Sequence, residues 1–316
     1  MQLPEETLTV PPFSRRSFLG AAGLTSAALL TATGSLTAKI SSPRAPRQAI
    51  VVWLEGGLSQ IDSWDPKPFA AGRQFAPIET SVPGLWLSEL FPNVAKQMHH
   101  LTVVRSFVAA SQDHDSAVLS LESSVASAAN AWALPEVTET FPLARVVLDG
   151  GRSSRPTRLH TLASRQLKAD AAVTWDRYGD NEFGRSARLA ARLVEQGTRL
   201  VEIRRGGFDT HTCNEVTLRA QAEVVDPALA ALIVDLDERN LLAETAVLVL
   251  TEFGRTPHAN AMGGRDHWSA AGSLLTSRSL WGAAAPTVIG QTDDSGGDVL
   301  VDPLSAQSVT QLLTSA

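Results

Sequence analysis

Residues 49–57 read AIVVWLEGG, in which six apolar side chains in succession are followed by an acidic residue and two glycines. A strand with one face in water alternates apolar and polar residues, whereas a strand covered on both faces is apolar throughout. This stretch therefore predicts a buried strand of the parallel type that ends in a glycine turn.

The chain beyond this strand alternates between the same kind of run and helical spacing. Further strands are predicted at residues 101–107, 145–148, 199–203 and 245–250, with short candidates at 273–275 and 287–289. Apolar residues at helical spacing predict helices at 116–127, 182–196, 216–239 and from about 304. Strands that alternate with helices predict an α/β fold, with a mostly parallel sheet and helices on both faces.

Size and composition narrow the class of protein. The chain has 316 residues, 44% of them hydrophobic and 19% charged, which suits one large globular domain. The net charge of −6 argues against a nucleic-acid partner, because such proteins carry a basic excess. Cys213 is the single cysteine, so no internal disulfide can form, and we interpret its thiol as structural.

The N-terminus carries an export signal. Residues 14–19 read SRRSFL, which matches the twin-arginine pattern, and a weakly apolar run rich in Ala, Gly and Thr leads to Leu36-Thr37-Ala38. The alternative is an N-terminal membrane helix, but the run is short and polar for one. We predict a twin-arginine signal peptide at 1–38 and a single domain at 39–316. This implies contact with the twin-arginine translocase, a periplasmic or extracellular location, and no stable membrane span in the mature form.

Acidic and histidine residues follow the predicted strands. They occur in 62–65, 113–115, 209–211, in Glu252, and in 266–267, and these segments or their neighbours hold four of the seven histidines. Because the carboxyl ends of parallel strands share one edge of a sheet, we expect these side chains to meet there. Carboxylates and imidazoles bind divalent metals such as Zn, Mn, Mg or Ca. For any one aspartate the alternative is a turn or a helix cap.

These segments resemble the exported family catalogued as domain of unknown function 1501, whose members look sulfatase-like and are placed in the alkaline phosphatase superfamily. The resemblance covers nearly the whole mature chain. Its motifs are LEGG at 54–57 with IDSWDPKP at 61–68, RYG at 177–179 with FG at 183–184, LAARLVE at 189–195, GFDTH at 207–211, EFGRTP at 252–257 and GRDHW at 264–268.

The resemblance implies a fold in which metals bridge a phosphate or sulfate group at the edge of the sheet. The metal ligands that it implies are Asp62, Asp209, His211, Glu252, Asp266 and His267. It also implies that Arg255 and Arg265 bind the anion, since a guanidinium pairs with a tetrahedral oxyanion through two hydrogen bonds. Salt bridges at loop ends are the alternative for both. The expected activity is hydrolysis of sulfate or phosphate esters, including small-molecule and glycan-linked ones.

The nucleophile is left open. Ser116 is the hydroxyl nearest the expected place, and a metal-bound water with His114 or Asp113 as base is the alternative. The chain also departs from the family pattern, with Glu55 in place of a glycine, Gln60 in place of a histidine, and a shorter middle region.

Two other functions compete with hydrolysis. A catalytically silent relative would keep the fold and bind anionic glycans, with Trp64 and Trp268 stacking on sugar rings or merely packing. An exported redox protein is disfavoured, because the sequence lacks the haem, iron–sulfur and dinucleotide motifs.

Overall fold

The apolar runs form a seven-stranded sheet in the computed structural model of the chain, which describes Pro46 and residues 48–67, 73–131, 145–149, 175–281 and 285–314. The strand order is β11-β4-β10-β7-β1-β6-β5, and only β10 runs against the others. The strands are β1 (Gln48–Leu54), β4 (Leu101–Phe107), β5 (Arg145–Asp149), β6 (Leu200–Arg205), β7 (Thr245–Leu250), β10 (Gly272–Ser277) and β11 (Val288–Ile289).

Strand β1 lies in the interior of the sheet, and its side chains are covered on both faces. It pairs in parallel with β6 on one side and β7 on the other. All seven of its residues are buried. The continuous apolar run is thus explained by two layers of helices, one on each face.

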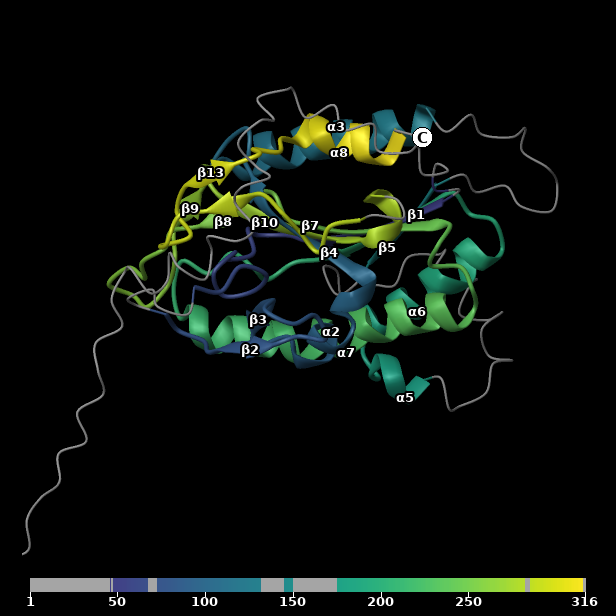
Figure 1. Cartoon of the computed structure of the whole chain (residues 1–316), viewed down its shortest axis with the longest axis horizontal. Helices are drawn as coiled ribbons and strands as arrows, with labels where there is room; N and C mark the ends of the chain where they lie inside the picture. Colours follow the sequence, from purple (N-terminus) through teal and green to yellow (C-terminus); the bar gives the residue numbers. More distant parts are fainter. Residues whose placement is uncertain are drawn as a thin grey trace, which may run out of the picture. The chain divides into compact units, whose positions relative to one another are not determined.

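The two faces are covered by different helices, as Figure 1 shows. Helices α3 and α8 pack together over one face, around a core that includes Trp53, Leu121 and Val309. Helices α2, α6 and α7 cover the other face and bury the larger core. The helices are α2 (Pro92–Lys96), α3 (His114–Ala131), α5 (Trp175–Tyr178), α6 (Glu182–Glu195), α7 (Asn214–Glu238) and α8 (Ala306–Thr314), with 3-10 turns at Met98–His100 and Arg278–Trp281.

Local signals explain where α6 begins and ends. The side chain of Asn181 accepts a hydrogen bond of 2.8 Å from the backbone N–H of Gly184 and so caps the N-terminus. Gly197, with φ of +94°, follows the C-terminus in a conformation that favours glycine. Between these signals the apolar residues face the sheet, and this face is buried.

Short strands and loops build the edge of the sheet where the parallel strands end. Strand β8 pairs with β9, so that Gly254 lies opposite Trp268 and Arg255 opposite His267. The short strands are β2 (Pro77–Glu79), β3 (Trp86–Ser88), β8 (Gly254–Arg255), β9 (His267–Trp268), β12 (Gln291–Thr292) and β13 (Val299–Val301).

The predicted fold class is confirmed: the sheet is mostly parallel and has helices on both faces. The predicted signal peptide at 1–38 lies outside the described residues. Among the helices in the described part of the chain, none is both long and apolar enough to cross a membrane.

Candidate metal centre

Four side chains from three segments meet beyond the carboxyl ends of the parallel strands, namely His114, Asp209, His211 and His267. His114 is the first residue of α3, Asp209 and His211 follow β6, and His267 lies in β9. We call these four side chains the candidate centre. Ligand atoms of His114, Asp209 and His267 all lie within 4.8 Å of one another, which is close enough for them to share one ion.

The Nε2 atoms of the three histidines all face the carboxylate of Asp209. Nε2 of His114 lies 3.6 Å from Oδ2 of this carboxylate. Nε2 of His211 lies 3.2 Å from Oδ1, and Nε2 of His267 lies 3.4 Å from the same oxygen. The Nε2 atoms of His211 and His267 are 2.9 Å apart. Three imidazole nitrogens and one carboxylate therefore converge on a small volume.

Each of these histidines is anchored through its other ring nitrogen, Nδ1. The acceptors are Oε1 of Glu252 for His114 at 2.9 Å, Oδ1 of Asp266 for His211 at 2.9 Å, and the carbonyl oxygen of Gln112 for His267 at 2.7 Å. Carboxylate and carbonyl oxygens can only accept, so the hydrogen sits on Nδ1 in each ring. A neutral ring then has its lone pair at Nε2, facing the other ligands.

This arrangement fits a bound divalent metal. Two nitrogen lone pairs 2.9 Å apart repel one another unless a cation lies between them. A shared proton would satisfy one pair of rings, whereas a metal ion would satisfy His114, Asp209 and His267 together. Metal-binding histidines usually donate their outer N–H to a carboxylate or a backbone carbonyl, as these three do.

Asp209 is held in its ionised form. Burial by itself would raise the pKa of this carboxyl, but the hydrogen bond and the charge of Arg255 lower the pKa below its usual range. The bond from Nη2 of Arg255 to Oδ1 of Asp209 is 2.6 Å long. Asp209 is therefore charged at neutral pH and available to a cation.

The inner wall of the candidate centre is aromatic. The ring of Phe253, which is fully buried, lies 5.0 Å from that of His114 and 4.5 Å from that of His267, centroid to centroid. Gly56, with φ of +119°, lies against the backbone of Phe208 and Asp209. A Cβ at Gly56 would come 2.3 Å from the backbone nitrogen of Asp209. Only glycine allows the loop after β1 to approach so closely, and its N–H donates to Glu252 at 2.7 Å.

Asp62 and Arg265 lie apart from the candidate centre and pair with each other. Both side chains are fully buried, and Nε of Arg265 donates to Oδ2 of Asp62 at 2.7 Å. Asn214 also donates to this carboxylate, at 3.0 Å. Nη1 of Arg265 also donates to the carbonyl oxygens of Thr256 and Pro257, and Nη2 donates to Oδ1 of Asp62 at 3.3 Å. The structure thus places this pair where it joins loops rather than among the converging ligands.

Ser116 is exposed and lies in the first turn of α3. Its hydroxyl donates to Oδ1 of Asp113 at 2.7 Å, and its backbone N–H donates to the same oxygen at 2.9 Å. Asp113 thus caps the helix, and the two bonds lower the pKa of this carboxyl. Within the part of the chain that the structure describes, the Ser116 hydroxyl bonds to the cap residue Asp113.

Several contributors had no signal in the sequence. The anchor of His267 is a backbone carbonyl, which any residue at position 112 would provide. Asn260 holds both His211 and its partner Asp266, because its Nδ2 donates to the carbonyl oxygen of His211 at 2.9 Å and to Oδ1 of Asp266 at 3.1 Å.

The two tryptophans considered for sugar stacking differ in their surroundings. Trp64 is buried against Phe91 and packs in the core, whereas Trp268 is partly exposed.

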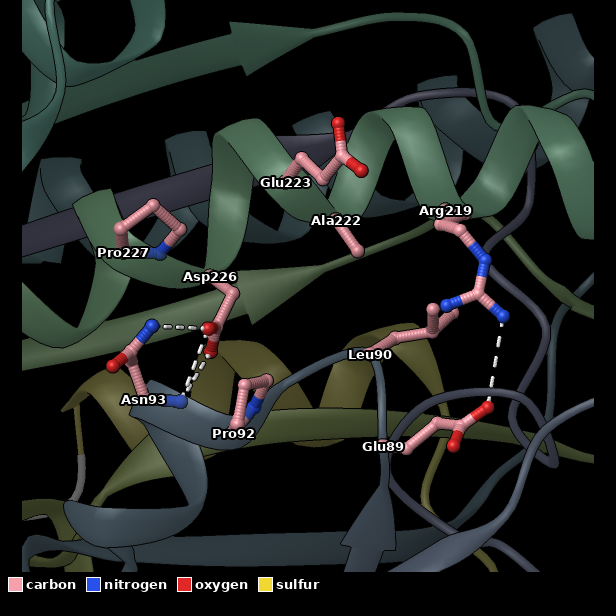
Figure 2. A pocket seen from close by; sticks show the side chains of 9 residues that line it. All are labelled: Glu89, Leu90, Pro92, Asn93, Arg219, Ala222, Glu223, Asp226 and Pro227. Carbon is pink, nitrogen blue, oxygen red and sulfur yellow. Dashed lines mark hydrogen bonds and ion pairs between the residues drawn. The ribbon is translucent and has the colours of Figure 1, made fainter.

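A pocket of about 300 Å³ opens between α2 and α7 (Figure 2) and contains none of the predicted site residues. Several of its polar groups pair with one another. The carboxylate of Asp226 accepts bonds from Asn93 and from the backbone N–H of Val94, and Arg219 faces Glu89 at 3.6 Å. The chemistry of the candidate centre is therefore separate from this pocket.

The chain matches a family model described as protein of unknown function (DUF1501) over residues 46–158 and 152–314. No curated protein matches the sequence. Among solved structures, the chain is similar to the C-terminal periplasmic domain of EcEptC from Escherichia coli in complex with Zn (14% identity, 86% of this chain and 83% of that chain, TM-score 0.40). It is also similar to the PsFucS1 sulfatase from Pseudoalteromonas sp. (11%, 96% and 72%, TM-score 0.43) and to a TAB5 alkaline phosphatase mutant with Mg bound (10%, 86% and 98%, TM-score 0.36).

Proposed function

The chain belongs to the DUF1501 family of proteins of unknown function, and we propose that it is a metal-dependent hydrolase of sulfate or phosphate esters. One observation carries the proposal: three histidines, each anchored at Nδ1, turn Nε2 toward the carboxylate of Asp209 at an accessible edge of the sheet. Hydrolases of charged esters use such an ion to neutralise developing charge and to activate water.

The donor set favours Zn over Mn, Mg or Ca. Imidazole nitrogens suit Zn, whereas Mn, Mg and Ca are better matched by oxygen ligands. His114, Asp209, His211 and His267 would hold the ion. Glu252 and Asp266 would orient two of the rings through their Nδ1 atoms.

The candidate centre is open to a substrate. The side chains of His114, His211 and Asp209 are 35%, 45% and 47% exposed. His114 also begins α3, an 18-residue helix whose N-terminus carries a partial positive charge. An anionic ester bound here would face both this helix end and the ligand cluster.

The residues around the candidate centre hold its histidine rings in place. Glu252 ties His114 to the β1 loop, because its Oε1 accepts from both the ring and Gly56. Asp266 fixes the ring of His211 and is itself held by Asn260. Ser116 is not needed in this scheme, since its hydroxyl donates to the helix cap.

We further propose that the protein reaches the periplasm or the outside of the cell through the twin-arginine translocase. The support is the SRRSFL pattern at residues 14–19 with a small-residue cleavage site at 36–38. This route exports folded proteins from a reducing compartment, which agrees with a chain that has one cysteine.

The proposed activity is tested with the purified mature protein. Release of nitrophenol or nitrocatechol from aryl phosphates and sulfates is measured with each of several added metals. We expect weak turnover with Zn that disappears in Asp209→Ala and in Glu252→Ala. His99→Ala, which removes an exposed histidine on another part of the chain, is the control and should retain the wild-type rate. Absence of turnover with every metal, together with binding of sulfated glycans, would contradict the hydrolase proposal.

A further inference from the structure

Arg255 connects the segments that build the candidate centre. Its side chain is fully buried and forms four hydrogen bonds. Nε donates to the carbonyl oxygen of Gly57 at 2.9 Å, and Nη1 donates to that of Arg265 at 2.9 Å. Nη2 donates to the carbonyl oxygen of Gly56 and, at 2.6 Å, to Oδ1 of Asp209. One guanidinium therefore joins the β1 loop, the loop after β6 and the segment that leads into β9, which carries His267.

We propose that Arg255 is a positioning residue that sets the metal affinity of the candidate centre through Asp209, and that it does not bind substrate. The inference rests on the metal centre of the proposed function. A guanidinium with no exposed surface, whose nitrogens already donate to three carbonyl oxygens and a carboxylate, is not accessible to the oxygens of an ester.

The geometry explains why the carboxylate needs this support. Oδ1 of Asp209 lies 3.2 Å from Nε2 of His211 and 3.4 Å from Nε2 of His267, and Oδ2 lies 3.6 Å from Nε2 of His114. Asp209 is nevertheless half exposed and belongs to a loop. Without Arg255 its side chain would be free to change rotamer, and the four donor groups would no longer converge. Arg255 also holds the backbone of the β1 loop and of Arg265 through their carbonyl oxygens.

The hydrogen-bonding geometry of Arg255 is distinct from its charge, because the planar guanidinium donates in several fixed directions at once. Lysine at this position would keep the charge but would lose the planar set of donors that reaches Asp209 and three carbonyl oxygens at once. The positioning effect can therefore be separated from the charge by a single conservative substitution.

The test measures metal affinity, not turnover. Zn affinity of the purified full-length mature chain is determined by competition with a chelating dye, and the Co²⁺-loaded protein is examined by visible absorption. Supporting groups of metal ligands are typically worth 10-fold to 100-fold in affinity. We expect Arg255→Lys to weaken Zn binding by about this factor and to change the Co²⁺ spectrum. If Arg255→Lys does not fold, as judged by near-ultraviolet circular dichroism, Arg255→Gln takes its place.

Two controls separate positioning from general loss of stability. Arg188→Lys alters another fully buried arginine, in α6, and should lower the melting temperature without weakening Zn binding. In an Asp209→Asn background, Arg255→Lys should have little further effect on Zn affinity, because both act through one carboxylate.

Two results would overturn the inference. One is unchanged Zn affinity in a folded Arg255 variant, and the other is an equal loss in both backgrounds. If the wild-type protein binds Zn as described but hydrolyses no ester, the proposed function fails, and the affinity measurements still decide the role of Arg255.

Discussion

Replacing Glu252 with glutamine separates the effect of its charge on the candidate centre from the effect of its shape. Glu252 is 2% exposed, and its Oε1 accepts from the N–H of Gly56 at 2.7 Å and faces Nδ1 of His114 at 2.9 Å. Its Oε2 lies 3.4 Å from the hydroxyl of Thr251. Glutamine has the same shape, so its Oε1 can keep both bonds while its amide nitrogen faces Thr251. The substitution removes the charge and leaves the geometry.

The expected loss of Zn affinity follows from the hydrogen bond between His114 and Glu252, in which glutamine removes the charge of the acceptor. A hydrogen bond between an imidazole and a carboxylate strengthens when the ring binds a metal, and outer partners of this kind contribute 10-fold to 100-fold to metal affinity. We therefore expect Glu252→Gln to weaken Zn binding by about 10-fold to 100-fold, or roughly 1.4 to 2.7 kcal/mol. The free energy of unfolding of the metal-free protein should change less, because the bonds to Gly56 and Thr251 are kept.

The assay is a Zn titration against a chelating dye, with denaturant unfolding of the metal-free protein in parallel. Glu202→Gln is the matched control, since Glu202 is also a fully buried glutamate but pairs with Arg204 on β6. It should affect unfolding and leave Zn affinity unchanged. Equal Zn affinity in Glu252→Gln and the wild type would refute the reasoning that Glu252 supports a metal-binding ring.

Three further predictions concern export, the serine and acid pH. Replacing Arg15 and Arg16 with lysine should leave the full-length precursor in the cytosol, and normal processing of this variant in cell fractions would disprove the signal assignment. Ser116→Ala should keep most of the esterase rate, because its hydroxyl donates to Asp113; complete loss of turnover would instead identify Ser116 as the nucleophile. The lowered pKa of Asp113, caused mainly by the side-chain and backbone bonds from Ser116, should stabilise the fold above the usual value of 3.8, and this contribution should disappear as the pH falls through the lower folded value. Asp113→Asn keeps a cap that does not titrate, so its unfolding free energy should fall less steeply below about pH 4 than that of the wild type; equal slopes would contradict this account of the cap.

Much of the fold is encoded in local patterns. The continuous apolar run at residues 49–54 requires cover on both faces, and the alternation with helices then fixes a parallel sheet. The direction of β10 could not be predicted in this way. A short strand such as Gly272–Ser277, in which two leucines lie among small and hydroxyl residues, reads the same in either direction. Its antiparallel pairing with β4 and β7 depends on how the chain returns across the sheet.

The candidate centre was predictable in its residue types but not in its pairings. Asp209, His211 and His267 meet as expected, because the ends of parallel strands share one edge. Asp62 and Arg265 follow the same kind of strand or loop, yet they pair with each other in the interior. Sequence spacing places a carboxylate near an edge of the sheet. Whether that carboxylate faces a metal site or pairs with a buried arginine depends on contacts formed by distant segments.

Two positions that depart from the family pattern have structural roles here. Gln60 donates to the carbonyl oxygen of Arg255 at 2.9 Å and accepts from its N–H at 2.8 Å, so its amide pairs with the backbone as a strand would. Glu55 accepts from Arg204 at 3.1 Å, at the end of β1. Both contacts hold the β1 loop in place beside Asp209.

Anomalous scattering from crystals of the native protein, collected on both sides of the Zn and Mn absorption edges, tests the metal centre most directly. We predict one peak bounded by the Nε2 atoms of His114, His211 and His267 and by the carboxylate of Asp209. The peak should be absent from crystals of a variant in which His211 and His267 are both replaced by alanine. A native protein with no anomalous peak at these side chains, and whose melting temperature responds neither to chelator nor to added metal, would contradict the account.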